Sequence, residues 1–368
     1  MTGTLLRIVL PLIAVTYPVL VAGQTNRHPD PRFLQSPRPP SFRASLTDPA
    51  SQPPFRLRAT PTARFGDESD SEATLLGDIL AASFLPDGGV AILDDKLAHL
   101  RIFDRSARPL ETVGRAGQGP GEFAGRLLSL ATDFRAQILV ADLSRSLKFY
   151  HHTSTGYQYS RAVPLGLSPR AMCLLDSSLV ALGPIAGRPE ALHTFRLDGT
   201  KVRDFGALYE SPNTWFNYQF VVGRLACDPD RHLAYFALET GFGEIRAYRA
   251  DGQLIWRTAI DGFLSNIIED LPRGYQVLPS PHGVHTVRSL TLLPQLGLLL
   301  QVGHRARADL DEGAWYSTLT SFLLDPDSGQ PVCLGTTLPL IVAARGEQVL
   351  VIGEDPVPHF EIHALTAP

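Results

Sequence analysis

The chain is poor in cysteine, methionine and lysine, and it has no excess of positive charge. Its 368 residues include 3 cysteines and 2 methionines, and its formal net charge is −4 with a pI near 6.3. A protein that binds nucleic acid through its phosphates needs a basic surface, so no nucleic-acid partner is expected. Because the only lysines are Lys96, Lys148 and Lys201, arginine is the main cation, and this bias by itself indicates no function.

The three cysteines are Cys173, Cys227 and Cys333, and they are too far apart for a CxxC redox or metal motif. Each lies in an apolar, strand-like context, which favours three buried thiols. A Cys173–Cys227 bridge between neighbouring sheets is the alternative, because export would permit a disulfide. The sequence leaves both arrangements open.

No apolar run reaches the roughly 20 residues of a membrane-spanning helix. The N-terminus has Arg7, an apolar stretch at 8–22 and small residues up to Gly23, which is typical of a signal peptide over residues 1–23. Cleavage near Gly23 predicts export to the periplasm or the extracellular space. An uncleaved anchor is the alternative, and it would be the only contact with a membrane. Residues 24–54 are rich in Pro, Ser and Arg, and we expect a disordered linker there.

Helical periodicity is scarce after residue 54. Short alternating runs separated by Gly, Pro, Asp and Ser turns dominate instead, which indicates an all-β fold. The runs recur in units of four at 78–114, 126–166, 171–206, 223–260 and 287–337, and a final unit of three lies at 339–365. A repeat of this length predicts a β-propeller.

The final unit lacks its outer strand, whereas residues 55–65 have a strand pattern and no unit of their own. We therefore expect the N-terminal strand to complete the last blade, because ring closure leaves only short strand edges exposed. The prediction is a six-bladed β-propeller with four-stranded blades over residues 55–366. Two β-sandwich domains are the alternative, but they explain neither the missing strand nor the spare one.

A turn rich in glycine follows the first unit. Its residues are Gly117, Gly119, Pro120, Gly121, Glu122 and Phe123. The turn lacks the third glycine of a dinucleotide motif and the lysine of a P-loop, and Pro120 has no N–H to offer a phosphate. We expect a structural turn, in which Phe123 wedges between blades and Glu122 accepts hydrogen bonds from the neighbouring link.

This turn, together with Asp94 and Asp142 after the second strands of two units, resembles the NHL-type six-bladed β-propellers. It is especially similar to the exported bacterial proteins grouped as six-bladed β-propeller proteins. The resemblance extends over most of the chain as a blade pattern, although the glycine-rich signature occurs once. It implies a fold and export, and it implies no activity.

Four arginines stand at the starts of predicted inner strands. They are Arg126, Arg170, Arg224 and Arg288. Inner strands surround the axis of a propeller, so we expect these side chains near the mouth of its central channel. Like charges repel one another unless carboxylates or an anionic ligand balance them. The arginines therefore predict either an anion-binding pocket or ion pairs between blades.

Long loops are expected on the same face, and they carry aromatic residues that include Trp215, Tyr218 and Trp315. Aromatic side chains beside arginines suit the recognition of a partner, although they could equally pack the loops onto the blades. The function predicted is an exported binding module for a protein, a peptide or an anionic small ligand. No cofactor is expected for this function.

A metal-dependent hydrolase or lyase of the lactonase-like propeller type is the alternative function. His282, His285 and His304 could hold zinc, and carboxylates after the second strands could hold calcium. Those carboxylates are Asp94, Asp142, Glu239 and Glu354. The chain has neither an HExxH nor a GxSxG motif, so no catalytic residue is assigned and an enzyme is the less favoured interpretation.

Overall fold

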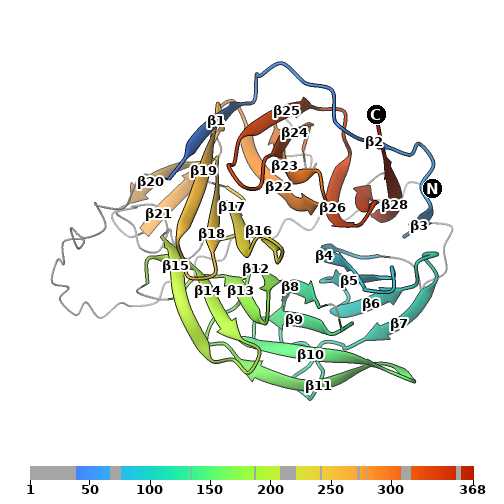
Figure 1. Ribbon diagram of the computed structural model, residues 1–368. Helices are drawn as coiled ribbons and strands as arrows, with labels where there is room; N and C mark the ends of the chain where they lie inside the picture. The colour runs from blue at the N-terminus through green and yellow to red at the C-terminus, as the bar shows by residue number, and fades with distance from the viewer. Residues whose placement is uncertain are drawn as a thin grey trace, which may run out of the picture. The chain divides into compact units, whose positions relative to one another are not determined.

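The computed structural model describes residues 39–66, 76–133, 135–185, 188–207, 221–240, 243–271, 274–278, 280–307, 316–353 and 358–368. Every element in these residues is a β-strand, so the described chain contains no helix that could cross a membrane. The strands build six blades around a ring, each a sheet of four antiparallel strands (Figure 1). The structure thus confirms the predicted six-bladed β-propeller.

Successive strands run from the inside of each blade to its outside. The first blade contains β4 (Ile79–Phe84), β5 (Val90–Asp94), β6 (His99–Phe103) and β7 (Pro109–Val113), and the second contains β8 (Leu127–Thr132), β9 (Ile138–Asp142), β10 (Ser146–Thr153) and β11 (Gly156–Pro164). The third contains β12 (Ala171–Leu175), β13 (Ser178–Leu182), β14 (Glu190–Arg196) and β15 (Lys201–Ala207), and the fourth contains β16 (Gly223–Asp228), β17 (Leu233–Leu238), β18 (Glu244–Arg249) and β19 (Leu254–Asp261). The fifth contains β22 (Val284–Leu293), β23 (Gly297–Arg305), β24 (Thr318–Leu324) and β25 (Pro331–Gly335), and the sixth contains β26 (Leu340–Arg345), β27 (Gln348–Gly353) and β28 (His359–Thr366). A hairpin of β20 (Ile267–Leu271) and β21 (Gly274–Leu278) lies in the connection between the fourth and fifth blades.

The blades pack face to face because their middle strands are apolar on both sides. In β5, Val90 and Ile92 belong to a core cluster shared with the sixth blade, whereas Ala91 and Leu93 belong to one shared with the second blade. Successive side chains of a strand point to opposite faces, so one strand supplies two interfaces. The core is therefore divided into wedges between neighbouring blades.

The N-terminal strand closes the ring, as predicted. Its two short pieces, β2 (Arg56–Leu57) and β3 (Ala63–Phe65), pair with the free edge of β28. Phe65 is 1% exposed, and its ring stacks on Phe360 of the sixth blade and on Phe103 of the first, at centroid distances of 5.5 and 4.7 Å. The closure thus joins the two ends of the chain both by main-chain pairing and by aromatic packing.

The expected disordered linker is wrong for its last part. β1 (Ser41–Ser45) pairs in parallel with the outer strand β19, and Ala44 is buried in the core cluster of the fourth and fifth blades. The chain then passes the fifth blade, where the Ser51 N–H donates to the Cys333 carbonyl at 2.8 Å, and reaches the buried Phe55. We call residues 39–57 the strap (Figure 1). It is ordered because the edge of an outer strand offers unpaired main-chain groups, and these can bind a segment that has no apolar pattern.

The turn between the third and fourth strands of a blade packs against the outer strand of the preceding blade. In the fifth blade, Pro326 O accepts a hydrogen bond from Trp256 Nε1 of the fourth blade at 2.9 Å. The Thr258 hydroxyl donates to Gly329 O at 2.5 Å, and the Trp256 ring lies directly against Gly329. Gly329 has a φ of +79°, so this turn needs glycine both for its conformation and for its contact.

Gly329→Ala is expected to lower the free energy of unfolding by about 2–3 kcal/mol. An added Cβ would lie 2.4 Å from Trp256 Cε3, and alanine is disfavoured at this φ. Gly262→Ala is the matched control, because Gly262 has a φ of +80° and no atom within 4 Å of its Cβ position. Urea denaturation would measure both losses of unfolding free energy. The loss in Gly262→Ala should come only from the strained backbone, so it should be the smaller of the two. An equal loss in both variants would contradict the packing contribution of Trp256.

Candidate functional site

One face of the ring carries the connections between blades. The inner strands all begin there, because each link returns from an outer strand to the next inner strand, and the turns between second and third strands lie on the same side. We call this the link face. A rigid scaffold that presents long connections on one side is typical of binding proteins. The aromatic residues predicted for this face, Trp215, Tyr218 and Trp315, lie outside the described residues.

Arg126 immediately precedes the inner strand β8 and is paired with the preceding blade. Its Nε donates to Asp95 Oδ2 at 2.9 Å, and 67% of its side chain is exposed. Asp95 also accepts the N–H of Leu127 at 2.8 Å. Asp95 thus balances the charge of Arg126 while it ties the first blade to the second.

Arg224 is the second residue of β16 and reaches the following blade. Its Nη2 lies 3.2 Å from Glu239 Oε2, and its Nε donates to the Val287 carbonyl at 3.3 Å. The Val287 N–H donates to the Glu239 carbonyl at 2.8 Å. Arg224 and Glu239 therefore form a junction between the fourth and fifth blades. Sequence reasoning missed Asp95 and Glu239 as partners of these arginines, although each is an acidic residue directly at or after the end of a second strand.

Arg170 differs from these two arginines. It immediately precedes β12, and its N–H donates to the Leu182 carbonyl at 2.7 Å. Its side chain is half-buried and makes no hydrogen bond or ion pair with any residue that the structure describes. Removing a charge from water without a counter-charge is unfavourable, so the surroundings of Arg170 favour the arrival of an anion.

Arg288 does not open an inner strand, which corrects the predicted alignment of the four arginines. β22 begins at Val284, and Arg288 is a bulged residue inside it, between Val287 and Ser289, which both pair with β23. The pairing of β22 and β23 extends further toward the link face than the sequence pattern suggested. The half-buried side chain of Arg288 packs over Gly303 and beside Tyr316, so its environment differs from that of Arg170.

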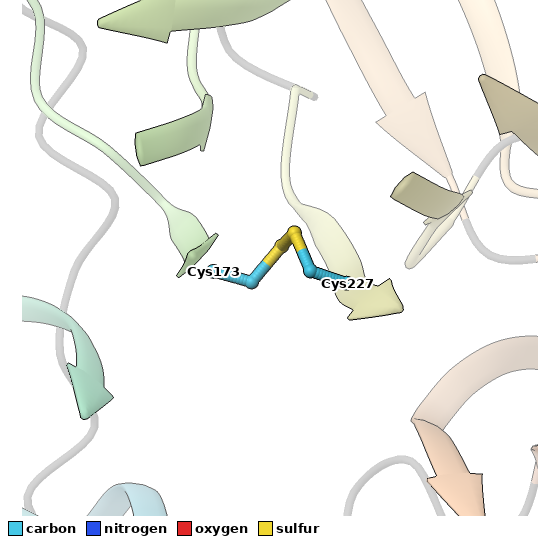
Figure 2. Close-up of a disulfide and its surroundings, with 2 residues drawn as sticks. All are labelled: Cys173 and Cys227. Carbon is cyan, nitrogen blue, oxygen red and sulfur yellow. A yellow bond between two sulfur atoms is a disulfide. The ribbon is translucent and has the colours of Figure 1, made fainter. Parts of the chain in front are cut away.

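A disulfide joins the inner strands of the third and fourth blades. Cys173 of β12 and Cys227 of β16 are bonded, with their Cα atoms 5.7 Å apart (Figure 2). The favoured prediction of three buried thiols is thus wrong for this pair, while Cys333 is a buried free cysteine. The pairing depends on two strands that are 54 residues apart in the chain but adjacent in the ring. Arg170 and Arg224 stand three residues before the two half-cystines.

The glycine-rich turn is held by its own side chains. Phe123 is fully buried in the core cluster between the first and second blades. Glu122 accepts the Gly119 N–H at 2.8 Å and pairs with Arg115 at 2.7 Å. The Gly119 N–H and the Arg115 guanidinium hold the pKa of the Glu122 carboxyl below its usual value. Both donors belong to the same link, which corrects the expectation of bonds from the neighbouring one, because the turn folds back on itself.

Asp94 and Asp142 hold links onto their blades. Both are fully buried. Asp94 accepts the N–H groups of Gly77 and Asp78 at 2.8 and 3.2 Å, and Asp142 accepts the N–H of Ala124 at 2.8 Å. Asp142 also pairs with the Lys148 ammonium, so the oxygens of both carboxylates are occupied by nearby donors, and among the described residues they belong to no metal-binding group. Of the other two carboxylates of the calcium hypothesis, Glu239 pairs with Arg224 and Glu354 lies outside the described residues.

The histidines of the zinc hypothesis use their ring nitrogens in other ways. His285 Nδ1 accepts the Leu264 N–H at 2.8 Å, and His304 Nε2 lies 3.2 Å from the His282 carbonyl. The rings of His285 and His304 lie against each other in a tilted arrangement, with centroids 4.7 Å apart. Across the described residues, no three His, Cys, Asp or Glu side chains are grouped so that they could hold a metal ion.

Acid is expected to weaken this part of the fold through His285. Burial, aided by the neighbouring His304, lowers the pKa of His285 to about 4 from 6.5. A lowered pKa means that the unfolded chain takes up the proton first, so stability falls as the pH drops from about 6.5 to about 4. Urea denaturation at pH 7 and pH 4 would show a smaller loss for His285→Gln than for the wild type. His151→Gln, at an exposed position, should behave as the wild type, and an equal loss in all three proteins would contradict the role of His285.

Comparison with known proteins identifies a fold. No protein-family model matches the sequence, and neither does any curated protein. A predicted exported protein from Bacteroides fragilis matches in structure with a TM-score of 0.56 and 11% sequence identity, over 89% of this chain and 99% of the other. A member of the DUF4221 family from Bacteroides vulgatus matches with a TM-score of 0.55 and 9% identity, over 86% and 100%. At these identities the likeness is one of fold alone.

Proposed function

We propose that this protein is an exported binding module whose link face recognises an anionic group on a protein, a peptide or a small molecule. The observation that carries the proposal is Arg170, a half-buried arginine at the start of an inner strand with no counter-charge among the described residues. Asp95 supplies a negative charge to Arg126, and Glu239 supplies one to Arg224. An anionic ligand would supply the corresponding negative charge to Arg170. Guanidinium groups suit this role because their planar donors match carboxylate and phosphate oxygens.

The position of Arg170 supports a role in recognition. Arg224 is at the equivalent place on the adjacent inner strand, three residues before the other half of the disulfide. Arg224 is held by Glu239 and by the Val287 carbonyl of the fifth blade, so among the described residues Arg170 is the guanidinium group of this pair that is left to contact a carboxylate or phosphate. The half-buried setting would strengthen such contacts, because screening by water and salt is weaker there.

Export belongs to the same proposal. The signal-peptide pattern at 1–23 supports it, and so does the likeness in fold to the predicted exported protein of Bacteroides fragilis. The Cys173–Cys227 disulfide agrees with an oxidising compartment. The glycine-rich turn at Gly117–Phe123 supports the finer assignment to the NHL-type propellers.

Arg170→Glu is expected to weaken the binding of an anionic probe at least tenfold. The probe is fluorescein-labelled hexaglutamate, with citrate and inorganic phosphate as competitors, and fluorescence anisotropy measures its dissociation constant. Charge reversal replaces attraction by repulsion at the proposed contact. Binding should also weaken as sodium chloride rises from 0.05 to 0.5 M, because salt screens the interaction.

Arg196→Glu is the matched control for this experiment. Arg196 is exposed at the end of β14, on the face opposite the link face, so its reversal changes the net charge equally and leaves the proposed contact intact. Affinity should be retained in this variant. Equal affinity of the wild type and Arg170→Glu, or no binding by the wild type at any salt concentration, would reject the anion site.

A further inference from the structure

The seam between the third and fourth blades is built differently from the other seams. Elsewhere a polar contact joins the inner strands or their ends. These contacts are Ser83–Thr132, Ser129–Pro169 O, Arg224–Val287 O, Ser289–Ile341 O and Arg345–Pro86 O. Between β12 and β16 the described residues form no such hydrogen bond, and the Cys173–Cys227 disulfide joins the strands instead. One seam of the ring is thus closed by a covalent bond.

The remaining polar contacts of this seam lie at its periphery. The His232 ring pairs with Asp176 at 3.0 Å on the opposite face, with side chains 67% and 49% exposed. Arg246 Nη1 donates to the Ala207 carbonyl at 2.8 Å near the outer strands. An exposed ion pair contributes little to stability. Near the axis, therefore, the disulfide is the strongest constraint on the spacing of β12 and β16.

The same bond lies close to the proposed anion site. Both inner strands begin at the link face, and Arg170 and Arg224 stand three residues before Cys173 and Cys227. Three residues of a strand span roughly 10 Å. The disulfide thus restrains the two strand ends that carry these arginines, and both of its half-cystines are half-buried rather than enclosed in the core.

We propose that the Cys173–Cys227 disulfide is a redox latch, which closes the seam between the third and fourth blades and sets the spacing of Arg170 and Arg224. Oxidised protein has a closed seam, and the strand ends that carry Arg170 and Arg224 are held at a fixed spacing. Reduced protein has a seam held by apolar packing and peripheral contacts, and its two strand ends move independently. The proposal that the disulfide closes the seam depends only on the contacts between the third and fourth blades. Its effect on ligand binding rests on the proposed function.

The reductant is a small dithiol. Its two thiols give up two electrons and two protons and close to a cyclic disulfide, while the Cys173–Cys227 bond breaks and both sulfurs become thiols. In an oxidising compartment a small-molecule disulfide would reverse the step by thiol–disulfide exchange: the Cys173–Cys227 bond forms again, and the small disulfide takes up the two electrons and two protons and becomes two thiols. Cys333 is buried and takes no part in the exchange.

The test compares the oxidised full-length protein with the same protein treated with dithiothreitol. Hydrogen exchange of peptides that cover β12 and β16 should become at least tenfold faster on reduction, because opening of the seam exposes inner-strand amides. The affinity for labelled hexaglutamate should fall at least fivefold. The double variant Cys173→Ser/Cys227→Ser should have the exchange rates and affinity of the reduced protein, and dithiothreitol should change neither. Cys333→Ala should respond to dithiothreitol as the wild type does.

The outcomes separate the latch from the binding function. Unchanged exchange in β12 and β16 would overturn the latch. Faster exchange with unchanged affinity would overturn the link between the latch and the arginines. If oxidised protein does not bind hexaglutamate at all, the proposed function fails, and hydrogen exchange alone then decides the latch.

Discussion

Asp142→Ala is expected to lower the free energy of unfolding by about 3–5 kcal/mol. Asp142 is fully buried and pairs with Lys148, whose side chain is only 8% exposed. The Lys148 ammonium lies 6.0 Å from the centroid of the Phe123 ring, inside the wedge between the first and second blades. Removing the carboxylate leaves this ammonium buried without a counter-charge and the Ala124 N–H without its acceptor.

Urea denaturation under non-reducing conditions, followed by the fluorescence of the chain's three tryptophans, of which Trp256 is fully buried, would measure the loss. Asp176→Asn is the control, because it removes the negative charge from the exposed pair with His232, keeps a residue that tolerates the positive φ of this position, and should cost less than about 1 kcal/mol. Asp142→Ala/Lys148→Met should recover part of the loss, since both buried charges are then absent. A loss below about 1 kcal/mol for Asp142→Ala would contradict a structural role for this ion pair.

Phe65→Ala is expected to lower the free energy of unfolding by a similar amount, about 3–5 kcal/mol. Phe65 supplies the side chain with which the N-terminal strand fills the wedge between the sixth and first blades. Its loss leaves a cavity at the closure and weakens the hold of β3 on the edge of β28. Hydrogen exchange of β28 should accelerate together with the loss of stability.

Arg64→Ala is the control for this prediction. Arg64 lies on the same strand, but its side chain is 41% exposed and pairs with Glu361 at 3.3 Å. Its removal should change stability by less than about 1 kcal/mol. If Phe65→Ala were as stable as Arg64→Ala, the N-terminal strand would not be the closure of the ring.

The closure could be predicted because both of its halves leave a mark in the sequence. A unit of three strands at 339–365 lacks a strand, and the pattern at 55–65 has no unit. The strap could not be predicted in this way. β1 reads SFRAS, and only Ala44 among its residues is buried, because the segment is held by main-chain pairing to the edge of β19. Main-chain pairing leaves no periodic apolar signal.

The candidate site was predicted in part. Alignment of the units placed Arg170 and Arg224 at the starts of neighbouring inner strands. It did not reveal that Asp95, 31 residues before Arg126, balances that arginine while Arg170 has no such partner among the described residues. Whether an arginine is paired with a carboxylate depends on the side chains that the fold brings beside it.

The sequence by itself determined the repeat, the six blades and the closing strand, because these depend on the alternation of apolar residues and on turns between neighbouring strands. Only the tertiary structure decided the Cys173–Cys227 bond, the ordered strap and the difference between Arg170 and the two arginines that have acidic partners, Arg126 and Arg224. Each of these arises from contacts between blades, which join residues far apart in the chain. Local patterns carry no information about such contacts until the ring is closed.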